Sequence, residues 1–107
     1  MLCAGEASGD MHGAALLQHL LEERPDIKIS AMGGAALRAM DIEMLVDNES
    51  IAVMGLVEVL KHYPAIRRAL KTMQKAVVSR RPALLILIDY VEFNLKLAAT
   101  AKQAGVK

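Results

Sequence analysis

An acidic side chain directly follows an uninterrupted apolar run in the last quarter of the sequence. Residues 83–88 read ALLILI, and Asp89 comes next. In open α/β sheets, ligands bind beyond the carboxyl ends of the strands, where such a side chain projects toward the cleft. A carboxylate in a partly dry cleft can take a proton from a hydroxyl group. Asp89 is therefore a candidate general base. The alternatives that the residues leave open are that Asp89 caps the following helix or only ends the strand.

A turn with two glycines is the second candidate site. The stretch AGEASGD, residues 4–10, separates a short apolar lead-in from a helical pattern. Gly5 and Gly9 allow a positive φ and a close approach of the backbone. Ser8 and Asp10 are good N-cap residues, and N–H groups at a helix start can hold a phosphate or a sugar hydroxyl. The spacing of the glycines matches neither the dinucleotide-binding motif nor the P-loop. A well-capped turn that binds no ligand is therefore the alternative interpretation.

The elements that must position these residues alternate between strand and helix. Unbroken apolar strands between helical patterns predict an α/β fold, a Rossmann-like parallel sheet with helices on both faces. Gly13 is expected to let the first helix lie close to the sheet, and Pro64 to start a second helix after residues 52–63. The expected strands cover residues 1–4, 27–32, 43–46 and 83–88, and the expected helices cover residues 10–23, 35–40, 52–63, 64–79 and 92–104.

Composition limits the classes of protein to which the chain can belong. Its 107 residues form one domain at most, and 54% hydrophobic content excludes disorder. A net charge of +1 gives no global field that would attract nucleic acid. No apolar run approaches the roughly 20 residues of a membrane span, and no signal peptide precedes the first strand. We therefore expect a cytoplasmic protein.

Cysteine and histidine suggest no metal chemistry. Cys3 is the only cysteine, and nothing basic beside it would activate a thiolate, so we expect a small buried residue. His12, His19 and His62 are scattered without the spacing of metal ligands. We expect neither a metal site nor a cofactor.

Three stretches in order resemble the lipid-A-disaccharide synthase family. They are AGEASGD at 4–10, IAVMGLVEVL at 51–60 and IDYVEFNLKLA at 88–98. With the intervening pattern, the resemblance spans essentially the whole chain. The family is similar to two-domain B-type glycosyltransferases, in which two Rossmann-like domains face a cleft. The resemblance implies that residues 1–107 are an incomplete N-terminal, acceptor-side domain, without the C-terminal nucleotide-sugar domain.

The two ends of the chain fit a fragment of a longer protein. The first strand has about four residues where the mean is about 5–6. Gly105 is typical of a helix C-cap and is followed by what resembles the first residues of another strand. A degenerate gene remnant is a further alternative.

The resemblance implies an inverting glycosyl transfer in lipid A biosynthesis. The full enzyme would transfer 2,3-diacylglucosamine from its UDP derivative to 2,3-diacylglucosamine 1-phosphate, and this fragment alone is expected to be inactive. Asp89 matches the family's essential acidic residue. The family usually has Ala-Pro-Asp where this chain has Tyr90-Val91-Glu92, which leaves the orientation of Asp89 open. The rival interpretation is a small α/β module that binds an anion or nucleotide at the glycine turn.

The same resemblance implies contacts with the acceptor. Phe93 is expected in the core, and Asn94 either as a hydrogen bonder at the helix start or as a sugar contact. Met54 and Glu58 match the family motif and would line the path of the acceptor. The full set of expected acceptor contacts is Gly5, Ser8, Gly9, Asp10, Met54, Glu58 and Asn94.

An apolar stripe beside a cationic face suggests docking on a membrane. Seven basic residues and no acid occur between Val59 and Ile88. Such a surface suits an anionic membrane, with a buried helix beside an ordinary solvated one as the alternative. The family is associated with the cytoplasmic side of the inner membrane, and a homodimer of the full-length enzyme is allowed. The expected membrane contacts are Val57, Val59, Leu60, Tyr63, Ile66, Arg67 and Lys71.

Overall fold

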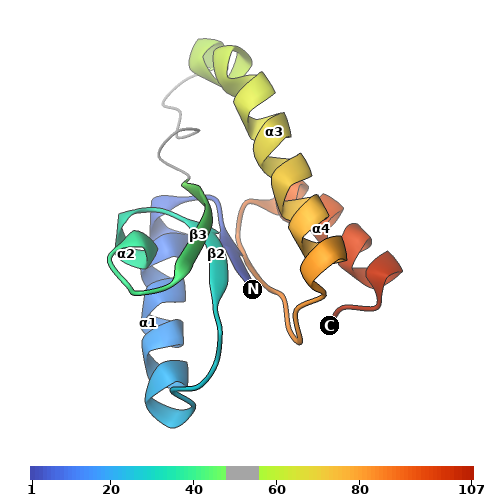
Figure 1. Ribbon diagram of the computed structural model, residues 1–107. Helices are drawn as coiled ribbons and strands as arrows, with labels where there is room; N and C mark the ends of the chain where they lie inside the picture. The colour runs from blue at the N-terminus through green and yellow to red at the C-terminus, as the bar shows by residue number, and fades with distance from the viewer. Residues whose placement is uncertain (48–55) are drawn as a thin grey trace.

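The computed structural model describes the backbone of residues 1–47 and 56–107 and the side chains of residues 1–47 and 64–107. Strands and helices alternate along the chain (Figure 1). The elements in order are β1 (Leu2–Ala4), α1 (Ala7–Glu23), β2 (Ser30–Gly33), α2 (Ala35–Arg38), β3 (Glu43–Asp47), α3 (Leu56–Arg80), β4 (Ile86–Ile88) and α4 (Val91–Ala104).

The four strands form one parallel sheet in the order β3-β2-β1-β4. Leu2 of β1 is paired with Ala31 of β2 on one side and with Ile86 of β4 on the other. The chain therefore builds the sheet outward from β1 to β3 and then crosses back to add β4 on the other side of β1. This reversal creates a topological switch point between the carboxyl ends of β1 and β4. The predicted parallel sheet is confirmed.

Helices cover both faces of the sheet, as predicted. Figure 1 shows α1 and α2 on one face and α3 and α4 on the other. Because side chains alternate along a strand, Cys3 points toward α3 and α4, whereas Leu2 and Ala4 join the cluster beneath α1 and α2. All three side chains are fully buried, so β1 is the centre of both cores.

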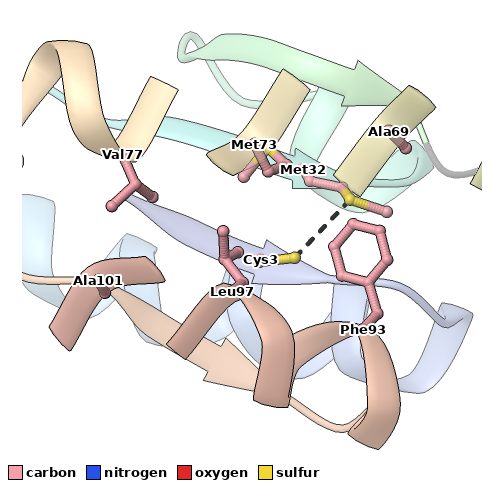
Figure 2. Close-up of a cluster of buried hydrophobic side chains, with 8 residues drawn as sticks. All are labelled: Cys3, Met32, Ala69, Met73, Val77, Phe93, Leu97 and Ala101. Carbon is pink, nitrogen blue, oxygen red and sulfur yellow. Dashed lines mark hydrogen bonds between the residues drawn. The ribbon is translucent and has the colours of Figure 1, made fainter. Parts of the chain in front are cut away.

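The cluster under α3 and α4 is built from side chains spaced one helical turn apart (Figure 2). The Cys3 Sγ–H lies 3.7 Å from Met32 Sδ and donates to it. Burial raises the pKa of the Cys3 thiol to about 12, which makes it a neutral packing residue, as predicted. Phe93 is buried in the same cluster, also as predicted. The other members are Ala69, Met73 and Val77 of α3 and Leu97 and Ala101 of α4.

Glycines of α1 bring this helix close to the sheet. A Cβ atom at Gly13 would lie 3.0 Å from Leu2 Cδ2, and one at Gly9 would lie 3.1 Å from Ile88 Cγ2. The prediction for Gly13 is confirmed. Gly5 and Gly9 do not use the positive φ that glycine allows, since neither is among the positive-φ residues of the described chain. Close approach, and not backbone conformation, explains the two glycines.

Pro64 lies inside α3, so the prediction that it starts a second helix is wrong. Proline has no amide hydrogen and removes one hydrogen bond from a helix interior. The turns that follow Pro64 are held on the sheet, since Ala69, Met73 and Val77 are all buried on one stripe. Tertiary contacts therefore outweigh the local signal.

Three of the strands, β1, β2 and β4, are shorter than the predicted segments, whereas β3 ends one residue later than predicted. β4 covers three residues of the run 83–88, and these are only partly buried because β4 has a single partner strand. Gly105 caps α4 with a φ of 75°, as predicted. No strand is assigned to residues 106–107, but the Lys107 carbonyl accepts a hydrogen bond from the Leu85 N–H at 2.6 Å, beside the start of β4.

Candidate functional site

Asp89 and the glycine turn meet at the topological switch point. Ala4 and Ile88 are paired, so the residues that follow them, Gly5 and Asp89, leave the sheet at the same edge. This is where a doubly wound sheet binds ligands. Asp89 is exposed, and no hydrogen bond or ion pair engages its carboxylate within the described part of the chain. The two candidate sites are thus at the same edge of the sheet.

The chain turns from β4 into α4 through two left-handed residues. Asp89 and Tyr90 both have a φ of 50°, a conformation that is costly for residues other than glycine. Tyr90, and not Asp89, occupies the N-cap position of α4, so the capping alternative for Asp89 is wrong. This corner leaves the Asp89 side chain in solvent at the edge of the sheet.

Asn94 holds this corner from within the protein. Its Nδ2 donates to the carbonyl of Asp89 at 2.6 Å and to that of Ile88 at 3.2 Å. Asn94 is 5% exposed, and its Oδ1 has no hydrogen-bond partner among the described residues. The first of the two predicted roles, a hydrogen bond at the helix start, is therefore present.

The ring of Tyr90 lies directly over Gly5. A Cβ atom at Gly5 would be 2.2 Å from Tyr90 Cδ2 and 2.3 Å from Cγ, so only glycine fits beneath the ring. The ring also packs on Phe93, with centroids 5.2 Å apart. Burial raises the pKa of the Tyr90 hydroxyl. The side of Gly5 that was predicted to receive a ligand is thus filled by this chain's own tyrosine.

Asp10 caps a different helix from the one predicted. α1 begins at Ala7, with Glu6 at its N-cap and no side-chain cap, so the prediction that Ser8 or Asp10 caps α1 is wrong. Asp10 is buried, and its carboxylate accepts hydrogen bonds from three backbone N–H groups at the start of α2. The donors are Gly34 at 2.7 Å, Ala36 at 2.8 Å and Leu37 at 3.1 Å.

A groove of about 740 Å³ opens between α3 and α4 next to the switch point. We refer to it as the α3–α4 groove. Three of its residues were predicted as membrane contacts. Its lining includes Ile66, Arg67, Leu70 and Lys71 of α3 and Tyr90 and Lys96 from the start of α4.

Sequence reasoning missed Glu6, Glu92 and Lys96 as residues of this groove. Glu6 follows β1, and the other two lie on α4, which the fold packs beside α3. No local pattern marks them, because only the packing of the two helices brings them together with Arg67. Glu92 comes three residues after the candidate base in the sequence.

Several predicted contacts cannot be placed. Met54 lies outside the described residues. Glu58, Val57, Val59, Leu60 and Tyr63 fall within α3, in the turns whose side chains are not described. Ser8 is exposed in the first turn of α1, close to the glycine turn.

Within the described residues, no helix is both long and apolar enough to cross a membrane. The same ranges contain no group of three or more His, Cys, Asp or Glu side chains that could hold a metal ion.

Comparison with known proteins agrees with the motifs. Residues 1–107 match the family model of lipid-A-disaccharide synthetase. Over 107 residues the chain is 48% identical to the lipid-A-disaccharide synthase of Geobacter sulfurreducens, and over 106 residues it is 44% identical to that of Myxococcus xanthus. These matches cover 100% and 99% of the chain, which spans about 28% of the length of either relative. The chain belongs to the lipid-A-disaccharide synthetase family.

Proposed function

We propose that this chain forms the acceptor-binding part of an inverting glycosyltransferase of lipid A biosynthesis. The observation that carries the proposal is the exposed carboxylate of Asp89, which has no partner among the described residues and lies at the switch point of the sheet. The names of its curated relatives support the same activity. The donor nucleotide would be bound by the C-terminal domain of the full-length protein, so residues 1–107 alone would be inactive.

In the proposed reaction, a hydroxyl of 2,3-diacylglucosamine 1-phosphate attacks the anomeric carbon of UDP-2,3-diacylglucosamine. Asp89 takes the hydroxyl proton as the new carbon–oxygen bond forms. The bond from the anomeric carbon to UDP breaks on the opposite side of the ring, which inverts the configuration. The products are lipid A disaccharide 1-phosphate and UDP.

The other predicted contacts support this role in two ways. Ser8, which is exposed at the start of α1, would approach the acceptor, as would Met54 and Glu58, whereas Gly5 and Gly9 would act through the packing of the turn. Asp10 and Asn94 are buried and would act by holding the backbone around the site, given their hydrogen bonds to α2 and to the corner at Asp89.

We also propose that the full-length protein docks peripherally on the cytoplasmic face of the anionic inner membrane. The run of basic residues on α3 supports this, since each basic residue near such a surface contributes about 1 kcal/mol. Ile66, Arg67 and Lys71 are the candidate contacts whose side chains are described. A homodimer of the full-length protein stays a prediction.

The rival module that binds an anion or nucleotide at the glycine turn has less support. Tyr90 fills the space over Gly5, and Gly9 packs against Ile88. Both glycines therefore have a packing role that needs no ligand.

The test uses the Geobacter sulfurreducens relative with its matching segment replaced by residues 1–107, which we call the hybrid enzyme. Asp89→Asn should lower kcat by about 10³-fold, the scale of general base catalysis. Asparagine also tolerates the left-handed conformation, so the melting temperature should stay unchanged. Asp41→Asn is the matched control, because Asp41 is exposed and precedes β3 at the opposite edge of the sheet. Turnover of Asp89→Asn near that of the unmodified hybrid would remove Asp89 as the base.

A further inference from the structure

The α3–α4 groove combines apolar and cationic side chains from two helices. Its apolar members include Ile66 and Leu70 of α3 and Val91 and Phe93 of α4. Val91 is 68% exposed, so its side chain is accessible to a ligand in the groove. A volume of about 740 Å³ falls in the range of sites for small molecules. The groove therefore has the size and the apolar surface to hold part of a lipid.

Three cations line the same groove without partners of opposite charge. Arg67 and Lys71 lie one turn apart on α3, and Lys96 comes from α4. In the described ranges, none of the three forms an ion pair. Like charges one turn apart repel each other, and an anion between them removes that cost. A phosphate can accept charge-assisted hydrogen bonds from all three.

The groove also contains two carboxylates, both from segments that follow strands at the carboxyl edge of the sheet. Glu6 follows β1, and Glu92 is in the first turn of α4, three residues after Asp89. Lys96 is one helical turn farther along α4, about 6 Å away. Carboxylates accept hydrogen bonds from hydroxyl groups and repel phosphate. A ligand that carries both hydroxyl groups and a phosphate matches this combination of carboxylates and cations.

We propose that the α3–α4 groove binds the acylated sugar phosphate that acts as acceptor. Arg67, Lys71 and Lys96 hold its phosphate, the apolar side chains contact an acyl chain, and the sugar hydroxyls lie toward Glu92 and Asp89. This inference rests on the proposed function and adds to it where the phosphate binds. Because Tyr90 covers Gly5, the phosphate goes to this groove and not to the glycine turn.

The kinetic test compares cations inside and outside the groove of the hybrid enzyme. The assay uses neutral detergent micelles without anionic lipid, so docking on a membrane contributes nothing to KM. Arg67→Gln, Lys71→Gln and Lys96→Gln should each raise the KM for 2,3-diacylglucosamine 1-phosphate about tenfold, with kcat and the KM of the donor little changed. Arg68→Gln and Lys75→Gln, exposed on α3 outside the groove, should leave the acceptor KM unchanged. An equal rise in both sets, or none in the first, would overturn the proposal.

A binding test keeps this inference separate from the proposed function. Decyl phosphate, below its micelle-forming concentration, is titrated into the ¹⁵N-labelled chain, with inorganic phosphate and decyl maltoside as comparison probes. Decyl phosphate should shift the amides of Ile66, Leu70 and Lys96 and bind tighter than either probe, and Arg67→Gln/Lys71→Gln should weaken it at least tenfold. If decyl phosphate binds in this way but the hybrid enzyme is inactive, the proposed reaction is refuted and the groove is supported as a site for phosphate amphiphiles. If the hybrid enzyme is active but decyl phosphate does not shift the amides of the groove residues, the proposed binding site in the groove is refuted and the proposed reaction is not.

Discussion

Adding a single methyl group at Gly5 should test how tightly the glycine turn and the Tyr90 corner are joined. In Gly5→Ala, the new Cβ would lie 2.2, 2.3 and 2.8 Å from three ring carbons of Tyr90. The ring has little room to move, because its Cγ is close to the backbone and its other side packs on Phe93. The clash must therefore displace the corner that also carries Asp89.

The expected cost follows from two opposing effects. Overpacking of this kind costs about 1–3 kcal/mol. Replacing glycine by alanine at a position without positive φ gains about 0.4–1 kcal/mol by restricting the unfolded chain, and Gly5 is such a position. We expect Gly5→Ala to lower the free energy of unfolding by about 1–2 kcal/mol. Once the ring is gone, in Tyr90→Ala, the same change should be neutral or slightly stabilising.

Urea denaturation of the four proteins in this double-mutant cycle, followed by circular dichroism, measures the coupling. Gly13→Ala is the matched control. Its Cβ would contact Leu2 and Ile88 instead of the tyrosine, so its effect should be the same with and without Tyr90. If Gly5→Ala costs as much in the Tyr90→Ala background as in the parent, the ring is not what requires glycine, and the geometry proposed for this corner is wrong.

Three further predictions concern buried polar groups. Asn94→Ala should lower the free energy of unfolding by about 1–3 kcal/mol, because the carbonyls of Ile88 and Asp89 lose their donor. The same variant of the hybrid enzyme should have a lower kcat. A kcat equal to that of the unmodified hybrid would show that Asn94 does not position the base. Asp10→Ala should cost about 2 kcal/mol or more in urea denaturation, since three N–H groups of α2 lose their acceptor, and a smaller loss would mean that water replaces it. Folding raises the pKa of the Cys3 thiol to about 12. The contribution of this group to the free energy of unfolding is therefore fully present below the unfolded pKa near 8.5, and it falls by about 1.4 kcal/mol per pH unit above that pKa. Cys3→Ala should lack this alkaline component, and parallel stability curves of the two proteins from pH 9 to 11 would contradict the prediction.

Local patterns were sufficient to predict the alternation of strands and helices and the position of the candidate base. Alternating helical periods and apolar runs indicate a parallel sheet, because only a strand covered on both faces needs an unbroken apolar sequence. The run before Asp89 placed this residue at the carboxyl end of a strand, and the sheet order then brought it to the glycine turn. These inferences depend on neighbours in sequence, and the structure bears them out.

Contacts between distant segments explain what the sequence could not reveal. Asp10 was expected to cap its own helix, but its partners are 24 to 27 residues away at the start of α2. Pro64 is a local helix breaker, yet packing of the following turns on the sheet carries the helix through it.

The sequence by itself determined the alternation of strands and helices and the acid that follows the last strand, because hydrophobic periodicity and turn residues act over a few neighbouring positions. Only the tertiary structure decided that Tyr90 covers Gly5 and that Lys96 joins Arg67 in one groove. Those arrangements arise when β4 pairs with β1 and α4 packs beside α3, and both contacts join segments that no local pattern relates.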